Sequence, residues 1–175
     1  MTERAIPPPA PDDHVDGSPD APLELVMYGD FQCPYCTAAQ SILRRVRDRL
    51  DGRLKFVFRH MPLPRHPDAG HAAQAAEAAH AQGAFWPMHD ALFAARGRLS
   101  LDDLASHADA LGLDGARVRS EVIDGVHAER VARDERSARA AGVTGTPAFF
   151  VNGVLHDGAF DAGSLLEALE AAEAR

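Results

Sequence analysis

The chain contains very little cysteine, lysine and tryptophan. Its 175 residues include two cysteines and one tryptophan, and Lys55 is the only lysine. Two cysteines cannot form the disulfide framework of a small secreted protein. The net charge of −8, without any basic block, argues against a nucleic-acid backbone or an anionic membrane surface as a partner.

Long apolar runs are also missing. No window reaches the ~18 apolar residues of a membrane helix, and the first residues lack the apolar stretch of a signal peptide. We therefore expect no membrane insertion and a cytoplasmic location, or an extracytoplasmic one if a signal segment has been removed. The hydrophobic content of 46% is enough for one domain with a substantial core.

The first 22 residues differ in composition from the rest. They are rich in proline and aspartate, a mixture that favours extended, solvated backbone and does not fold alone. We predict an N-terminal arm over residues 1–22, followed by a single domain over residues 23–175.

The domain begins with the pattern strand, helix, strand. "LELVMY" (23–28) is a short apolar run typical of a strand. Apolar residues with helical spacing predict a helix from Cys33, which Asp51-Gly52 ends. "RLKFVFRHMPL" (53–63) predicts the second strand, which the following prolines close.

The second half predicts a block of helices and then a hairpin. Five helical patterns follow one another between about residues 66 and 141, and Ser100 with Asp103 forms a capping signal. Asn152-Gly153 then joins two short strands, and Asp161 is placed to cap a last helix. A long helical segment between strands indicates an α/β domain with an inserted all-helical subdomain.

Both cysteines lie in "DFQCPYC" (30–36), between the predicted strand and helix. Free N–H groups and the helix dipole at a helix start stabilise a thiolate, so Cys33 is the candidate nucleophile. Cys36, one turn further, is placed to attack a mixed disulfide on Cys33 and is the candidate resolving thiol. Pro34 suits the first helical position, which needs no N–H donor.

Two other interpretations of the cysteine pair were weighed. A disulfide that closes a loop of two residues restricts an unfolded chain very little, which disfavours a purely structural disulfide. A zinc site needs four ligands, and no second CxxC exists. His66, His71, His80 and His89 have no i, i+4 spacing, and we expect them and His60 to be exposed and solvated; no metal site is predicted.

"DFQCPYC" behind an apolar strand, the helical insertion, and "GVTGTPAFFVNG" before a hairpin and a final helix together resemble the DsbA-like branch of the thioredoxin-fold thiol-disulfide oxidoreductases. The resemblance extends over residues ~14–172 and implies a thioredoxin fold. It implies that Cys33 is the nucleophile, that Cys36 resolves, and that Pro147 is a cis-proline facing them. Thr146 would then present its backbone to an extended substrate.

Three further residues were assigned to the site. Phe31 and Tyr35 are predicted to contact or orient unfolded substrates, and Tyr35 should be at least partly accessible. Relatives often carry a buried acid six positions before the first cysteine, where this chain has Met27. Strand alternation turns Glu24 to the other face, which leaves Asp30 or water as a possible proton relay.

The function that follows is exchange of disulfides with protein or small-molecule thiols, in an undetermined direction. Its partners would be thiol- or disulfide-containing proteins and an unidentified redox partner, and it would need no cofactor beyond a Cys33-Cys36 disulfide. One alternative is a non-catalytic binding or redox-sensing module. Another is a glutathione-using isomerase or transferase, disfavoured because such relatives usually have a single active-site Ser or Cys.

Overall fold

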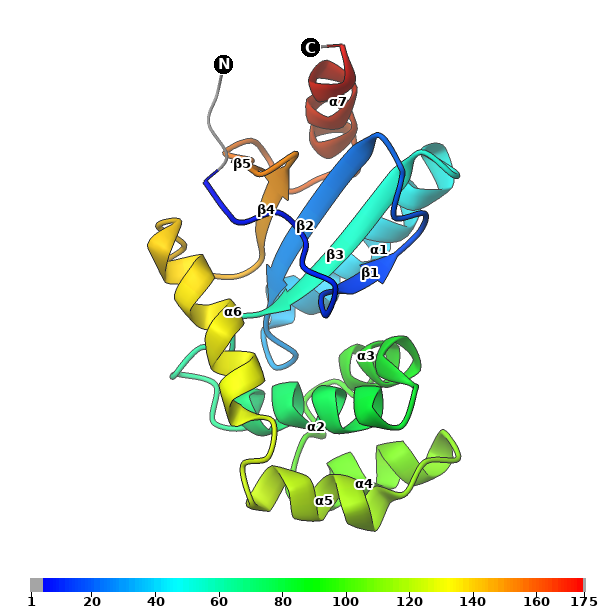
Figure 1. Cartoon of the computed structure of the whole chain (residues 1–175), viewed down its shortest axis with the longest axis vertical. Coiled ribbons are helices and arrows are strands. Elements are labelled where there is room, and N and C mark those ends of the chain that lie inside the picture. Colours follow the sequence, from blue (N-terminus) through cyan, green and yellow to red (C-terminus); the bar gives the residue numbers. More distant parts are fainter. Residues whose placement is uncertain (1–4, 175) are drawn as a thin grey trace.

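A computed structural model describes residues 5–174, which form one mixed sheet surrounded by helices (Figure 1). The strand order is β1-β3-β2-β4-β5. The strands are β1 (His14–Asp16), β2 (Leu23–Gly29), β3 (Leu54–His60), β4 (Ala148–Val151) and β5 (Val154–Leu155). The helices are α1 (Pro34–Arg49), α2 (Ala69–Ala81), α3 (Phe85–Ala94), α4 (Leu101–Ala110), α5 (Gly115–Ile123), α6 (Ala128–Ala140) and α7 (Ala162–Glu173).

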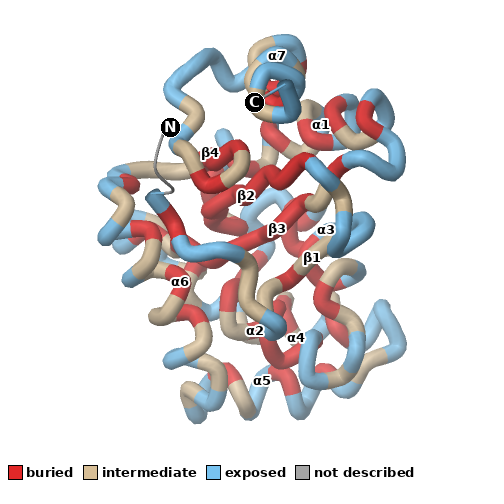
Figure 2. The backbone as a smooth tube through the Cα atoms, turned by 45° about the horizontal axis from the view of Figure 1, so that its top comes forward, coloured by how far each residue is buried: buried red, intermediate tan, exposed pale blue. Residues whose placement is uncertain are grey.

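The centre of the sheet is apolar on both faces. β2 and β3 are parallel, β4 is antiparallel to β2, and all seven residues of β2 are buried. Because side chains alternate along a strand, Leu25 and Met27 join the core beneath α1 and α7, whereas Val26 and Tyr28 join a smaller core beneath α6. The burial map shows these central strands as the most enclosed part of the chain (Figure 2).

The local signals of the sequence are confirmed at the helix and turn boundaries. Ser100 and Asp103 form a reciprocal capping box at α4, and Asp161 accepts a hydrogen bond from the Ser164 N–H at α7. Asn152 and Gly153 both have positive φ, 46° and 82°, as a two-residue hairpin turn requires. The Asn152-Gly153 turn sets the register of β4 against β5.

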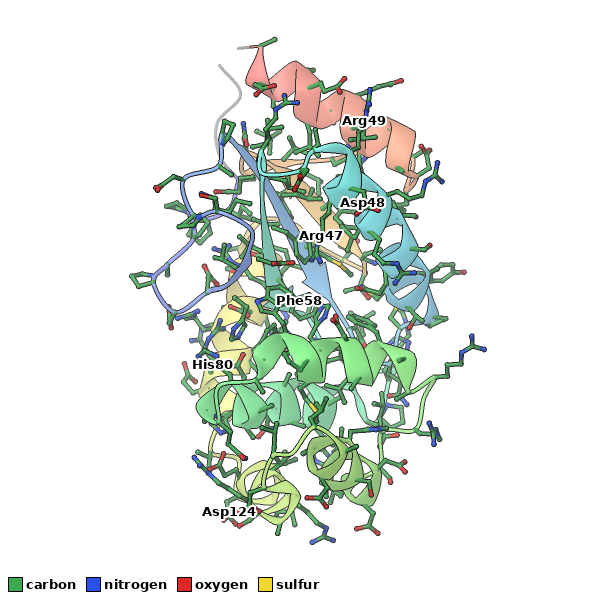
Figure 3. The ribbon with its side chains drawn as sticks, turned by 90° about the vertical axis from the view of Figure 1, so that its right-hand side faces the viewer. Arg47, Asp48, Arg49, Phe58, His80 and Asp124 are labelled. Atoms are coloured by element: carbon green, nitrogen blue, oxygen red, sulfur yellow. The ribbon has the colours of Figure 1, made fainter. Side chains whose placement is uncertain are left out.

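The five helices α2 to α6 lie between β3 and β4 in the chain, where the helical insertion is predicted. Figure 3 shows helices stacked beyond one end of the sheet, with Phe58 at that end. Phe58 contacts the rings of Phe85, His89 and Phe93 at centroid separations of 4.8–6.2 Å. The insertion is therefore packed against the sheet through an aromatic cluster.

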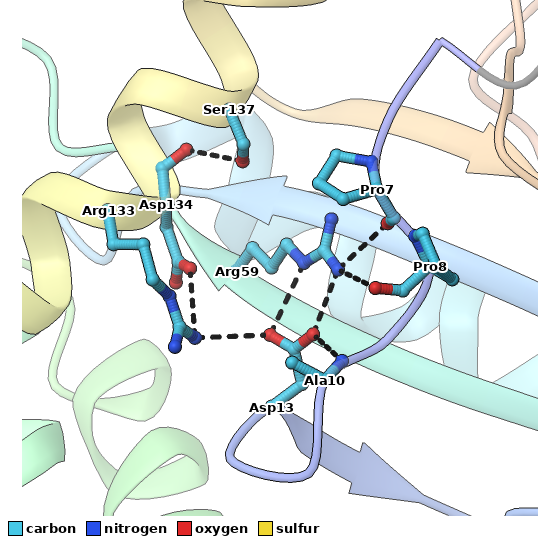
Figure 4. A pocket seen from close by; sticks show the side chains of 8 residues that line it. All are labelled: Pro7, Pro8, Ala10, Asp13, Arg59, Arg133, Asp134 and Ser137. Atoms are coloured by element: carbon cyan, nitrogen blue, oxygen red, sulfur yellow. Dashed lines mark hydrogen bonds and ion pairs between the residues drawn. The ribbon is translucent and has the colours of Figure 1, made fainter.

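Part of the predicted N-terminal arm is docked on the domain instead of being solvated; residues 1–4 of the arm lie outside the described residues. Residues 14–16 form β1, which pairs antiparallel with β3, and Ile6 is buried. Arg59 donates hydrogen bonds to the carbonyls of Pro7 and Pro8 and to the carboxylate of Asp13 (Figure 4). Composition describes what the arm does alone, whereas docking on β3 gives it partners that the arm itself does not contain.

A small cavity of about 190 Å³ lies between the arm and α6. Figure 4 shows Asp13 on its wall between Arg59 and Arg133. Asp13 lies 2.8 Å from Arg59 Nη2 and 3.7 Å from Arg133 Nη2, so the charges around the cavity are largely matched.

Within residues 5–174, no helix combines the length and the apolar character needed to cross a membrane.

Candidate active site

The two cysteines lie just after β2, where α1 begins. Cys33 occupies the N-cap of α1 with extended backbone angles, φ −75° and ψ 121°, and Pro34 takes the first helical position. At Gly29 a Cβ atom would lie 2.6 Å from the Phe58 ring, so this close approach requires glycine. The strand end and the helix start together fix the position of Cys33.

The surroundings separate the two thiols in acidity. The pKa of Cys33 is lowered to about 5, mainly because the Cys36 thiol donates to its thiolate, with help from the backbone N–H groups of Tyr35 and Cys36. Burial is the main reason that the pKa of Cys36 is raised well above its usual range. One sulfur is therefore a stable anion at neutral pH while the other keeps its proton.

The loop before β4 forms the opposite wall. The peptide bond between Thr146 and Pro147 is cis, in agreement with the resemblance, and the Thr146 carbonyl lies 3.6 Å from Cys33 Sγ. Thr146 Oγ1 is buried without a hydrogen-bond partner among the described residues. The Thr146 side chain also lowers the pKa of both thiols, so its hydroxyl is an available donor to a thiolate.

Access to the site is narrow. Cys33 is 1% exposed and Cys36 is fully buried, whereas Tyr35 is 73% exposed, as predicted for it. Phe31, which is predicted to contact substrate, is 2% exposed, and its ring packs against Phe58 and Phe93, so its contact with substrate stays a prediction. Its position beside the cysteine motif could not reveal that the side chain turns into the core.

Asp30 is the most connected polar group at the site. Its Oδ1 accepts hydrogen bonds from the N–H groups of Gln32 and Cys33, at 2.7 and 3.0 Å. Its Oδ2 accepts from the Leu63 N–H at 2.8 Å and lies 2.7 Å from His66 Nδ1. The carboxylate thus ties the turn that carries Cys33 to the loop between β3 and α2.

His66 and Gln32 belong to this site although no sequence motif predicts it. Gln32 makes a second link to the same loop, because its side chain exchanges two hydrogen bonds with Asp68. The local pattern carries no sign of these contacts, which join residues 33 to 36 positions apart. Three prolines around His66 indicate only that the loop is stiff.

The structure agrees with the expected placement of Met27 and Glu24. Met27 is fully buried in the core that also contains both cysteines. The carboxylate of Glu24 lies on the other face of the sheet, 3.4 Å from Lys55 Nζ. Of the three residues Glu24, Met27 and Asp30, Asp30 is the one whose carboxylate reaches the cysteine turn.

A second buried polar cluster lies under the arm, and it corrects the expectation of solvated histidines. His60 and His89 are 0% and 2% exposed, and His14 and His60 each place Nε2 at 2.6–2.7 Å from the same oxygen of Glu77. Two ligands around one zinc ion stand about 3.3 Å apart. In addition, His60 Nδ1 has no hydrogen-bond partner in the part of the chain that the structure describes, although a metal-bound histidine usually donates from that nitrogen. These contacts have the geometry of hydrogen bonds.

Comparison with known proteins agrees with this geometry. The crystal structure of a thioredoxin-like oxidoreductase from Silicibacter pomeroyi DSS-3 is 27% identical, with a TM-score of 0.85 over 95% of each chain. The crystal structure of oxidised BdbD from Bacillus subtilis has a TM-score of 0.88 over 99% of this chain and 100% of that one, at 21% identity. The latter likeness shows the fold alone.

A curated relative is much longer than this chain. Na(+)/H(+) antiporter NhaA 1 of Salinispora arenicola is 46% identical over 161 residues, which are 91% of this chain and 24% of that protein. The chain therefore spans about a quarter of the length of these curated relatives.

The family assignment comes from the match over most of the domain. The family model described as the DSBA-like thioredoxin domain matches residues 24–170, from β2 into α7. That range includes both cysteines, the cis peptide bond and the whole helical insertion. The chain belongs to the family of DSBA-like thioredoxin domains.

Proposed function

We propose that this chain exchanges disulfides with thiol-containing proteins through Cys33 and Cys36. The observation that carries the proposal is the separation of the two thiols: the pKa of Cys33 is lowered to about 5, while burial raises that of Cys36. Only the anion attacks a disulfide, so chemistry starts at Cys33.

The exchange proceeds in two balanced steps. The Cys33 thiolate attacks one sulfur of a substrate disulfide, and the second substrate sulfur leaves with the electron pair and takes up a proton. Cys36 then loses its proton and attacks Cys33 Sγ, which breaks the mixed disulfide and releases the substrate sulfur that Cys33 had attacked, as a thiol after it takes up a proton. Cys33 and Cys36 end oxidised and the substrate ends reduced; the reverse sequence oxidises a substrate dithiol.

The other residues have supporting roles in this proposal. The cis-linked Thr146 and Pro147 hold the partner opposite Cys33, where an extended substrate adds hydrogen bonds to the Thr146 backbone. Pro34 starts the helix that presents the thiolate, and the exposed ring of Tyr35 contacts the partner. Asp30 is the buried acid through which a proton leaves the site. No cofactor beyond the cysteine pair is required.

The test combines trapping with turnover. Cys36→Ser should accumulate a mixed disulfide on Cys33, because the resolving thiol is missing. Cys33→Ser should abolish both insulin reduction and the refolding of a scrambled disulfide protein, while an exposed control such as Ser41→Ala on α1 should retain both activities. If Cys33→Ser leaves both activities unchanged, the proposal fails.

A redox-sensing module is the second candidate, and the 1% exposure of Cys33 favours it. The curated relatives are named as antiporters and devote about a quarter of their length to a domain like this one, which suits a sensor attached to a transporter. A sensor changes state once per oxidant molecule, whereas an enzyme turns over. Counting disulfides exchanged per protein molecule separates the two.

A further inference from the structure

The Asp30 carboxylate lies between the cysteine turn and one histidine that reaches solvent. Its side chain is fully buried, and it is 2.7 Å from His66 Nδ1. The His66 side chain is 17% exposed, so its ring has an edge in contact with water. The pair therefore connects the interior of the site to solvent through a group that can gain or lose a proton.

The neighbouring carboxylates have other partners. Asp68 accepts a hydrogen bond from Gln32. Deeper in the fold, Glu77 is held by His14 and His60, and Asp134 pairs with Arg130 and accepts from the His60 N–H. Arg65, next to His66 in the loop, is exposed and makes no ion pair among the described residues. Among residues 5–174, His66 is the only basic side chain in contact with Asp30.

Asp30 contacts the segment that carries both cysteines. Its Oδ1 accepts from the Cys33 N–H at 3.0 Å, and its backbone N–H favours the thiolate of Cys36. A buried carboxylate disfavours a second negative charge in its neighbourhood, and a protonated imidazole beside it offsets that effect. The charge on His66 should therefore change the stability of the thiolate.

We propose that His66 is a positioning residue that tunes the thiol pair: its imidazole exchanges a proton with solvent and so sets the net charge of the Asp30-His66 pair beneath Cys33. This inference deepens the proposed function and rests on it. With His66 protonated the pair is neutral and the Cys33 thiolate is most stable. With His66 neutral the pair carries one negative charge, which makes the thiolate less stable and more nucleophilic.

The main experiment compares the reduced wild type with His66→Asn. An asparagine amide occupies the place of Nδ1 and donates to Asp30, but it does not titrate. The rate constant for alkylation of Cys33 should rise in two steps in the wild type, first as Cys33 ionises and then by about threefold between about pH 5 and 8, where histidine titrates. His66→Asn should lose the second step and follow the high-pH limit of the wild type, with a three- to tenfold smaller thiolate fraction near pH 5.

His71→Asn is the matched control, because His71 is an exposed histidine in the neighbouring helix α2. It should reproduce the wild-type profile. A second step that persists in His66→Asn, or a wild type without a second step, overturns the inference. Far-ultraviolet circular dichroism and thermal unfolding establish that the variants are folded.

A measurement on the unaltered protein keeps the test independent of folding. Because coupling is reciprocal, the nuclear magnetic resonance titration of the His66 ring should shift upward in the reduced, thiolate form relative to the oxidised form, by the same factor by which His66 changes thiolate stability. Equal midpoints in the two forms overturn the inference.

These titrations use no protein substrate. If Cys33→Ser leaves disulfide exchange unchanged, the proposed function fails, and the coupling between His66 and Cys33 is still measured by alkylation and resonance. If exchange depends on Cys33 but the profiles of wild type and His66→Asn coincide, only the role of His66 fails.

Discussion

The protein buries carboxylates in two regions, and the partners of these carboxylates differ. Under the N-terminal arm, Glu77 is held by His14 and His60, which are at most 3% exposed. Asp13 is held there mainly by the buried Arg59, with the partly exposed Arg130 and Arg133 each 3.7 Å away. At the cysteine turn, Asp30 is held by His66, which is partly exposed. The first region is sealed and the second is open to proton exchange.

Buried charge under the arm therefore contributes to the stability of the fold, whereas buried charge at the cysteine turn can affect the chemistry of the thiols. A sealed pair is strongly destabilising to break but does not respond to its surroundings until the fold itself opens. A pair with one exposed member changes its charge at small cost, and at the cysteine turn that change occurs next to the reacting sulfurs. We therefore expect arm mutations to alter stability and turn mutations to alter thiol reactivity.

The largest effect should come from removing the arginine that holds the arm. Arg59 contacts Asp13, Tyr28 and two arm carbonyls, so Arg59→Met leaves a buried carboxylate and two carbonyls with fewer donors. The free energy of unfolding, measured in urea, should fall by about 3–5 kcal/mol. Arg45→Met, at an exposed position of α1, should change it by less than about 0.5 kcal/mol.

The reactivity of Cys33 should not follow this loss of stability. The rate constant for alkylation of Cys33 in folded Arg59→Met should remain within about twofold of the wild type, because no charge near the thiols has changed. A large change in that rate would show that the two regions are coupled.

The next prediction places a carboxyl in the core below the cysteines. Met27→Glu should lower the free energy of unfolding by about 3–4 kcal/mol at neutral pH, because burial opposes ionisation of the introduced group. Its folded-state pKa is raised, so the loss of stability should be smallest at low pH and grow as the pH rises. It should also speed release of a mixed disulfide from Cys33, which a stopped-flow trapping assay measures.

Met27→Gln is the control that separates charge from polarity. It should lose stability by an amount that is independent of pH and should leave the rate of release unchanged. Faster release in Met27→Gln would mean that altered packing, rather than proton transfer, limits the resolving step.

The sealed cluster should make the wild type sensitive to acid. Burial lowers the pKa of His14, so the unfolded chain binds the extra proton first and stability should fall as the pH drops below about 6.5. The pKa of Glu77 is also lowered, through its hydrogen bonds to His14 and His60 acting against burial, so a further loss should follow below about pH 4.5.

Glu77→Gln removes the lower part of this pH dependence. At neutral pH we expect it to cost about 1–3 kcal/mol, because one charge-assisted acceptor is lost. Between about pH 5 and 3 its unfolding free energy should vary less than that of the wild type. Glu170→Gln, an exposed change in α7, should keep the wild-type slope, and an equal slope in Glu77→Gln would assign the acid sensitivity to other groups.

The sequence predicted the parts of this molecule whose signals are local. The cysteine motif, the Asn152-Gly153 turn and the caps at Ser100 and Asp161 each depend on residues within a few positions of one another. The order of elements followed from these signals, and the family resemblance supplied the fold and the pairing of Pro147 with the cysteines.

The parts that the sequence analysis missed depend on distant partners. Strand β1 has only three residues and is stabilised by pairing with β3, whose paired residues lie 40 to 44 positions away. Phe31 follows an apolar strand at a loop position from which either direction was open, and the aromatic cluster of α3 decides its burial. His66 belongs to the site because the loop after β3 lies against Asp30, and this tertiary contact has no local signal in the sequence.

The smallest expected effect sharpens the comparison from within the cysteine turn. Gln32 links this turn to Asp68 through two hydrogen bonds but carries no charge. Gln32→Ala should lower the free energy of unfolding by about 1 kcal/mol, the net value of one or two partly exposed hydrogen bonds. The pH profile of Cys33 alkylation should keep both of its steps, because the Asp30-His66 pair is intact.

Comparison of Gln32→Ala with His66→Asn then separates two effects: that of a titrating charge and that of attaching the cysteine turn to the loop after β3. Both residues attach the same turn to the same loop, and only one of them titrates. If Gln32→Ala also removes the second step of the alkylation profile, loosening of the turn explains the behaviour of both variants. A step that survives in Gln32→Ala and disappears in His66→Asn assigns the tuning of the thiols to the proton on His66.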